Sequence, residues 1–184
     1  MACHQNCASP EIIASRRSFI AGVAFTAIVP SAAFAQLSGP GSDADVRFMR
    51  MAIEEARQGD FPFGAVIVQD GAVIARGRNL GRTTRDPTAH GEMVAIRRGL
   101  ADHGPDALRG STLYTSGESC AMCMGAIIWC HIGRLVFAAS IAQLATKIDQ
   151  IMLTDADIAA KAQFAPISIT GGVLADEAMA LFTK

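Results

Sequence analysis

The sequence is short of charged and aromatic side chains and carries almost no net charge. Charged residues make up 18% of the 184 positions, aromatic residues make up 6%, and the formal net charge is −1. A protein that binds nucleic acid over a broad surface usually carries a basic excess, so this composition gives no sign of such a surface. Internal repeats are absent, low complexity is confined to a Gly-, Ser- and Pro-rich stretch at residues 36–44, and the length suits one domain.

The apolar run near the N-terminus is too short to span a membrane. Phe19–Val29 has eleven residues, whereas a spanning helix needs about 20. The run follows the pair Arg16-Arg17 and precedes Ala33-Phe34-Ala35, and this order is typical of a cleaved signal peptide of the twin-arginine export pathway. We therefore predict a signal peptide at residues 1–35, a linker at residues 36–44, a single domain at residues 45–184, and a periplasmic or otherwise exported protein.

Residue periodicity predicts helices that alternate with strands. Two β-branched runs flank Asp70-Gly71 within residues 64–77, which is a strong β-hairpin signal. Helices are predicted at residues 45–58, 89–101 (with Thr88 as its cap), 121–130, 141–161 and 176–182, and further strands at 111–116, 134–139 and, as an edge strand, 166–170. This order predicts an α/β domain with a mixed sheet that helices cover on both faces.

Histidine and cysteine are scarce, which narrows the candidates for a metal site. Cleavage after Ala35 would leave three histidines and three cysteines, of which Cys120 and Cys123 are three apart at the predicted start of a helix. The pair alone is compatible with a disulfide, a redox centre or half of a metal site. A thiol at a helix N-terminus has a lowered pKa, which favours the thiolate that binds metal.

His90 is the candidate for the missing ligand. It also lies at the start of a predicted helix, and Glu92 follows two residues later. Ligands of one nitrogen and two sulfurs suit zinc with a fourth position open to water, which is typical of a catalytic site rather than a closed structural one. Glu92 would then lie near that water without binding the metal, in a position suited to proton transfer.

These motifs resemble the zinc-dependent cytidine and deoxycytidylate deaminase superfamily, in which H-x-E pairs with P-C-x-x-C. The resemblance runs from about Val46 to Ala139 and is similar to the branch that holds guanine deaminases and tRNA adenosine deaminases. It includes PFGAVIV, DPTAHGE, LYTS, CAMCMGAI and GRLVFA, at residues 62–68, 86–92, 113–116, 120–127 and 133–138. It implies a three-layer α/β/α fold with a central mixed five-stranded sheet, one zinc ion per chain, and a homodimer.

The resemblance also implies roles for individual residues. His90, Cys120 and Cys123 match the zinc ligands, and Glu92 matches the catalytic proton shuttle. Four residues match positions that contact the substrate: Asn79, Phe63, Gly91 and Trp129. The chain departs from the family at Ser119, where proline usually precedes the first cysteine, and we expect the serine side chain to cap the helix instead.

The resulting functional hypothesis is a hydrolase that releases ammonia from a free nucleobase or nucleoside. The sequence GAIIW at residues 125–129 favours guanine. Cytosine or cytidine, and adenosine as in the tRNA enzymes, are the alternatives; the tRNA enzyme is disfavoured because an exported protein does not meet tRNA and nucleic acid is not an expected partner. Two other classes stay open: a catalytically inactive zinc-binding module, and a thiol redox protein, which leaves His90 and Glu92 unexplained.

Overall fold

The computed structural model describes residues 36–37 and 41–182, so the predicted signal peptide at residues 1–35 lies outside the described residues. In that part of the chain no helix is both long and apolar enough to cross a membrane. The strands are β1 (Gln36–Leu37), β2 (Gly64–Gln69), β3 (Ala72–Arg78), β4 (Thr112–Gly117), β5 (Arg134–Ala139) and β6 (Ser168–Thr170). The helices are α1 (Asp43–Arg57), α2 (Gly91–His103), η1 (Pro105–Ala107), α3 (Ala121–Trp129), α4 (Ile141–Leu144), α5 (Asp155–Ala159), α6 (Ala175–Met179) and η2 (Ala180–Phe182).

The strands form one mixed sheet in the order β1-β6-β5-β4-β2-β3. Strand β2 pairs antiparallel with β3 and β4, whereas β4, β5, β6 and β1 pair in parallel. The predicted five-stranded mixed sheet is therefore confirmed, and the two-residue strand β1 extends it from within the predicted linker. Because β1 pairs with β6, strand β6 is not the outer edge that the sequence predicted.

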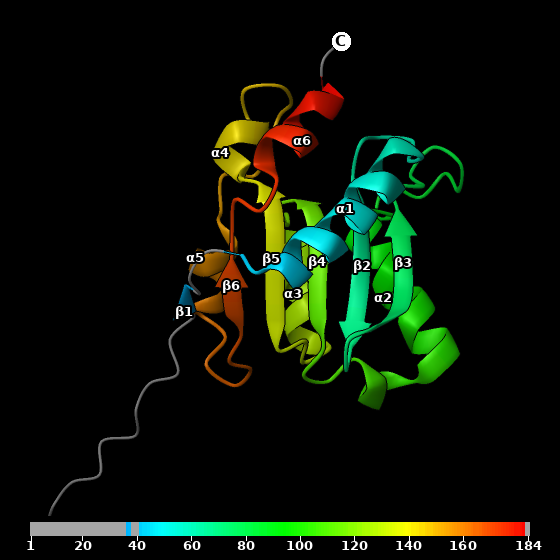
Figure 1. Cartoon of the computed structure of the whole chain (residues 1–184), viewed down its shortest axis with the longest axis vertical. Helices are drawn as coiled ribbons and strands as arrows, with labels where there is room; N and C mark the ends of the chain where they lie inside the picture. Colours follow the sequence, from blue (N-terminus) through cyan, green and yellow to red (C-terminus); the bar gives the residue numbers. More distant parts are fainter. Residues whose placement is uncertain (1–35, 38–40, 183–184) are drawn as a thin grey trace, which may run out of the picture. The chain divides into compact units, whose positions relative to one another are not determined.

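Helices cover both faces of the sheet, as the three-layer prediction requires (Figure 1). Successive side chains of a strand point to opposite faces, so Val66 and Val68 pack against α1, whereas Ala65 and Ile67 pack in the core with α2 and α3. Helices α4 and α6 contribute to the core on the α1 side of the sheet, and α5 contributes to the core on the side of α2 and α3. The alternating apolar residues of β2 thus serve two separate hydrophobic cores.

The predicted hairpin between β2 and β3 is confirmed. Its turn residues Asp70 and Gly71 have φ values of 50° and 77°, and a two-residue turn with both central residues in the left-handed region matches the twist of the strands. Gly77 in β3 is needed for a different reason: a Cβ atom there would lie 2.1 Å from the Gly91 carbonyl oxygen and 2.3 Å from the Ala95 nitrogen. Strand β3 therefore lies directly against the first turns of α2.

Three predicted helix boundaries were wrong. Helix α2 begins at Gly91 rather than Ala89, because Thr88 hydrogen-bonds to Asp86 and does not cap the helix. Helix α1 begins two residues early, at Asp43, where Ser42 and Asp45 form a capping box. Residues 141–161 contain two short helices and an irregular segment between them instead of one long helix.

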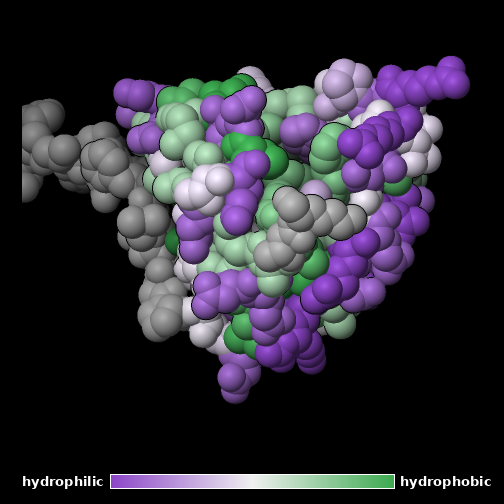
Figure 2. Space-filling view, turned by 90° about the horizontal axis from the view of Figure 1, so that it is seen from above, coloured by the Kyte–Doolittle hydropathy of each residue, from purple (hydrophilic) through white to green (hydrophobic). Residues whose placement is uncertain are grey.

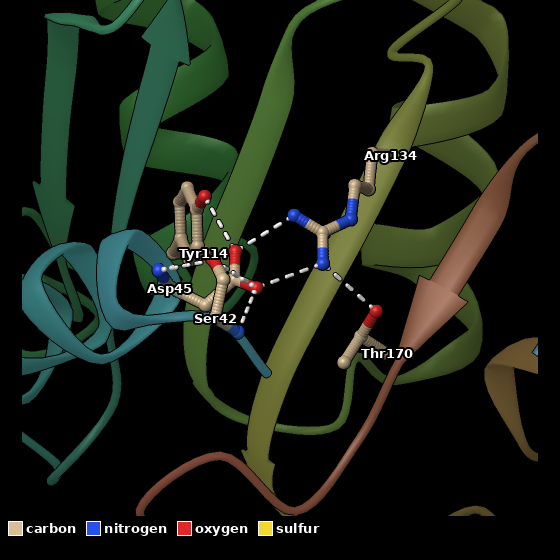
Figure 3. Close-up of polar contacts among 5 residues, drawn as sticks. All are labelled: Ser42, Asp45, Tyr114, Arg134 and Thr170. Atoms are coloured by element: carbon tan, nitrogen blue, oxygen red, sulfur yellow. Dashed lines mark hydrogen bonds and ion pairs between the residues drawn. The ribbon is translucent and has the colours of Figure 1, made fainter. Parts of the chain in front are cut away.

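A buried polar cluster joins α1 to the sheet (Figure 3). The carboxylate of Asp45 accepts hydrogen bonds from Arg134 of β5 at 2.7 and 3.0 Å, from the Tyr114 hydroxyl at 2.9 Å, and from the Ser42 backbone and hydroxyl at 2.8 and 3.0 Å. Arg134 also donates to the Thr170 hydroxyl of β6 at 3.0 Å. The cluster fixes the start of α1 over three neighbouring strands.

Candidate metal centre and substrate cavity

His90 and Cys120 are both helix N-cap residues. His90 directly precedes α2 and Cys120 directly precedes α3, and neither side chain caps its own helix. The strands before them, β3 and β4, run in the same direction because both are antiparallel to β2. Two helix N-termini therefore meet at one end of the sheet, the upper end in Figure 1, with their N-cap side chains free to bind something else.

Three donor atoms form a nearly equilateral triangle there. The distances from Cys120 Sγ to Cys123 Sγ, from Cys120 Sγ to His90 Nδ1 and from Cys123 Sγ to His90 Nδ1 are all 3.6 Å. Tetrahedral zinc with its usual bond lengths would need about 3.8 Å between two sulfurs and about 3.6 Å between sulfur and nitrogen. The donor types and their spacing therefore fit zinc, with three protein ligands.

The local electrostatics also suit a cation. The Cys123 thiol and His90 hydrogen-bond to Cys120 and, although burial opposes them, lower the pKa of Cys120 to about 4. The Cys123 thiol and His90 therefore favour the thiolate form of Cys120, which is the form that binds a metal. No other cluster of His, Cys, Asp and Glu side chains that could hold a metal ion occurs among the described residues, so the described part of the chain offers one metal centre.

A cavity of about 410 Å³ lies beside the triangle. It lies towards the end of the molecule that Figure 2 shows from above, where hydrophobic and hydrophilic side chains are interspersed. Glu92, predicted as the proton shuttle, lines it together with Asn79 and Phe63, which were predicted to contact the substrate. The other lining residues are Phe61, Pro87, His90, Glu118, Cys120, Met122, Ile148, Asp149, Gln150 and Ile151.

Each of these three side chains is held by its surroundings. Glu92 is buried in the first turn of α2, and burial raises the pKa of its carboxyl. Asn79 is buried just after β3, and its Oδ1 accepts the Gly81 N–H at 3.1 Å, so its amide nitrogen is left for the cavity. The Phe63 ring packs edge-on against Phe182, with 5.4 Å between the ring centroids.

Trp129 and Gly91, which the sequence assigned to substrate contact, are not among the residues that line the cavity. Trp129 does not line the cavity: it is the last residue of α3, 73% exposed, and its ring packs against Phe164. Nine residues of helix place it about 13 Å beyond Cys120 along the helix axis, so it cannot contact a ligand in this cavity within one chain. Gly91 is a close-packing position, since a Cβ atom there would lie 3.0 Å from Gly64 Cα.

Residues 148–151 are called the wall segment below, and Asp149 is the one among them that the sequence suggests as a residue that contacts the substrate. Four consecutive residues of this segment, Ile148 to Ile151, line the cavity, although residues 141–161 had been predicted as one helix. The apolar and polar side chains of the wall segment carry no motif. Only the fold brings them to the metal centre.

Ser119 does not act as the sequence predicted. Its hydroxyl has no hydrogen-bond partner in the described structure and caps nothing. Instead its backbone N–H donates to Asp155 Oδ2 at 3.1 Å. Burial, with Glu118 and Glu92 nearby, raises the pKa of Asp155 to about 8. The departure from the family's usual proline therefore supplies a backbone donor rather than a helix cap.

Comparison with known families accounts for this arrangement. Residues 42–139 match the family described as the cytidine and deoxycytidylate deaminase zinc-binding region. Its zinc-binding character and the His90, Cys120 and Cys123 triangle together confirm the predicted zinc cofactor.

Curated relatives and a solved structure extend the comparison. The chain is 51% identical over 78 residues to a guanine deaminase of Bacillus subtilis and 44% identical over 104 residues to a tRNA-specific adenosine deaminase of Haemophilus influenzae. These alignments cover 42% and 54% of this chain, and 50% and 60% of the respective relative. A solved structure of guanine deaminase from Nitrosomonas europaea superposes with a TM-score of 0.64 at 27% identity, over 80% of this chain and 84% of that one.

Proposed function

The chain belongs to the cytidine and deoxycytidylate deaminase family, and from this premise we propose that it is a zinc-dependent hydrolase that releases ammonia from a free nucleobase or nucleoside, with guanine the favoured substrate. One observation carries the proposal: the buried carboxyl of Glu92 lines the same cavity as His90 and Cys120, two members of the His-Cys-Cys triangle. That combination provides both a metal that activates water and a group that moves protons.

In this mechanism His90, Cys120 and Cys123 hold the metal, which when bound would lower the pKa of water enough to supply a nucleophile near neutral pH. Glu92 accepts a proton from the attacking water and delivers it to the ring nitrogen next to the carbon under attack. Glu92 then takes the second proton from the hydroxyl now on that carbon and delivers it to the amine; the C–N bond breaks, a carbonyl forms, and the amine leaves as ammonia. A carboxyl whose pKa is raised by burial is suited to this shuttle, because it takes up a proton more readily than an exposed carboxylate and holds it until the ring nitrogen or the amine accepts it.

The remaining cavity residues bind the base. The free amide nitrogen of Asn79 would donate a hydrogen bond to the ring or its substituent. Phe63 would pack against the planar ring. Asp149 and Gln150 of the wall segment supply an acidic and an amide side chain, which suit the N–H donors of guanine.

Guanine is favoured because guanine deaminases are among the relatives both by sequence and by structure. The tRNA-specific relative supports a second candidate, adenosine in tRNA. The near-neutral net charge of the chain argues against it, since tRNA binding depends on contacts from Lys and Arg to phosphates.

The test is an ammonia-release screen of purified, zinc-loaded protein against guanine, adenine, cytosine, their nucleosides and an adenosine-34 tRNA anticodon stem. We expect release from guanine above all others. Glu92→Gln should lower kcat by about 10²- to 10⁴-fold while the protein keeps one zinc per chain. Glu54→Gln, at an exposed carboxylate of α1, is the matched control and should leave turnover unchanged.

Each other outcome has a defined meaning. Full turnover by Glu92→Gln would refute its role in proton transfer. A zinc-loaded protein that releases ammonia from none of these compounds would be an inactive binding module. Free titration of the thiols of Cys120 and Cys123, without bound zinc, would favour the redox alternative.

Export and assembly belong to the same proposal. We propose that residues 1–35 direct the folded, zinc-loaded protein through the twin-arginine pathway, that residues 45–184 form the functional domain, and that two chains form a homodimer. Zinc bound before export would hold both sulfurs as thiolates and so prevent a disulfide between them in an oxidising compartment. Cell fractionation with N-terminal sequencing tests the first point: recovery from the cytoplasm with Arg16-Arg17 intact would contradict it.

A further inference from the structure

One carboxylate holds both ends of the segment that contains the cavity wall. Glu118 Oε2 accepts the backbone N–H of Ile141 at 2.8 Å, and Glu118 Oε1 accepts the backbone N–H of Asp155 at 3.1 Å. Residues 148–151 lie between these two attachment points. The segment from Ile141 to Asp155 is therefore a loop closed at its base by the residue two positions before the metal ligand Cys120.

A further hydrogen bond at the same base runs in the opposite direction. The Ser119 N–H donates to Asp155 Oδ2 at 3.1 Å, and both residues are completely buried. Proline, the residue that usually precedes the first cysteine in this family, has no N–H to donate. This attachment is therefore possible only because position 119 is not proline.

The surroundings of the buried Asp155 carboxyl are otherwise unfavourable. Its second oxygen, Oδ1, lacks a hydrogen-bond partner in the described structure, and Glu118 and Glu92 are close enough to raise its pKa electrostatically. A buried carboxyl in such surroundings lowers stability unless its hydrogen bonds compensate. The bonds that Asp155 makes are those that join the wall segment to the metal-binding loop.

We propose that Asp155 is a positioning residue that acts through the Ser119 N–H to hold the wall segment against the metal centre, and so sets the affinity for substrate. It does not line the cavity, so its effect is transmitted through residues 148–151. The inference rests on the proposed deaminase function for its effect on substrate, but the attachment itself can be measured without any substrate.

The experiment compares zinc-loaded Ser119→Pro, Asp155→Ala and Asp155→Asn with the unchanged protein. Ser119→Pro removes the backbone donor, together with a hydroxyl that makes no hydrogen bond in the described structure, and introduces the family's usual residue. Amide hydrogen exchange is measured over residues 145–154, and KM and kcat are measured with the best substrate of the ammonia screen. Asp157→Asn is the matched control, because Asp157 is an exposed acid on the same helix that bonds only to Thr154.

We expect Ser119→Pro and Asp155→Ala each to raise amide exchange in the wall segment and to raise KM by about three- to tenfold, the effect of losing one ordinary hydrogen bond. Zinc should stay at one per chain, and kcat should change by less than about threefold, because the wall segment carries none of the groups assigned to proton transfer. Asp155→Asn keeps an acceptor oxygen and should be milder in both readouts. The control should match the unchanged protein.

Unchanged exchange in Ser119→Pro would overturn the proposal whatever the activity. A fall in kcat with no change in KM would also overturn it, because it would place Asp155 in the chemical step. If Asp155→Ala fails to fold, Ser119→Pro and Asp155→Asn still decide. If no substrate is found, raised exchange in Ser119→Pro alone would support the attachment while the proposed function fails.

Discussion

Replacing Asp45 with asparagine removes the negative charge at the centre of the cluster that joins α1 to the sheet. The substitution keeps the size of the side chain and one acceptor oxygen. It leaves the Arg134 guanidinium facing an amide instead of a carboxylate that accepts two of its N–H groups. The hydrogen bonds from Tyr114 and Ser42 to the same carboxylate weaken with it, since bonds to a charged acceptor are the stronger kind.

The expected loss of stability depends on how deeply Asp45 and Arg134 are buried. Breaking a buried ion pair by changing one partner costs about 3–5 kcal/mol, because the other charge is left buried. The Asp45 side chain is 3% exposed but that of Arg134 is 29% exposed, so water can solvate part of the orphaned guanidinium. We therefore expect the lower end, a loss of about 3 kcal/mol in the free energy of unfolding.

Urea unfolding of the zinc-loaded protein at pH 7, followed by circular dichroism, measures this loss. Asp43→Asn is the matched control: it removes an acid from the same helical turn that makes no ion pair with a described residue, and should cost no more than about 1 kcal/mol. If Asp45→Asn and its control lose equal stability, the cluster contributes nothing beyond its helix-terminal charge and the reasoning is wrong.

The same variant has a predicted pH dependence. Burial alone would raise the pKa of Asp45, but hydrogen bonds from Arg134, Ser42 and Tyr114 outweigh burial and hold it well below its usual range. A carboxyl whose pKa is lower in the folded state stabilises the protein above its unfolded pKa, about 4, and loses that contribution as the pH falls further. The stability gap between the unchanged protein and Asp45→Asn should therefore narrow below about pH 4 and stay constant from pH 5 to 7.

Two further predictions concern the metal centre. Removing zinc with a chelator should lower the melting temperature by about 5–10 °C relative to zinc at 100 times its dissociation constant, and added zinc should restore it; a chelator without effect would exclude a bound metal. Gly77→Ala should destabilise the protein by about 1–3 kcal/mol and weaken zinc binding, because the new methyl displaces the first turns of α2 next to His90. Gly125→Ala, where a Cβ atom meets nothing within 4 Å, is its control and should be neutral or stabilising.

Sequence patterns predicted correctly those elements whose conformation depends on residues close together in the chain. The Asp70-Gly71 hairpin follows from two residues that tolerate positive φ between β-branched runs. His90, Cys120 and Cys123 could be recognised because ligand spacing within a few residues reflects how one helix start presents its side chains. Glu92 was found in the same way, through its fixed distance from His90.

The errors lie where distant contacts decide the conformation. Residues 141–161 have the composition of a helix. The Glu118 carboxylate nevertheless accepts the backbone N–H groups of Ile141 and Asp155, and this holds the segment from Ile141 to Asp155 as a loop. Trp129 was assigned to the substrate because GAIIW at residues 125–129 resembles the pattern of guanine deaminases. The rise of α3 nevertheless places it at the far end of that helix from the cavity.

The sequence by itself determined the family, the metal ligands and the alternation of strands and helices, because each of these depends on residue types at short spacing. Only the tertiary structure decided what closes the cavity and what Ser119 does. Ser119 and Asp155 are 36 positions apart, and a hydrogen bond between a backbone N–H and a carboxylate at that separation leaves no pattern in the sequence. It exists only because the fold brings the two chain segments within 3.1 Å of each other.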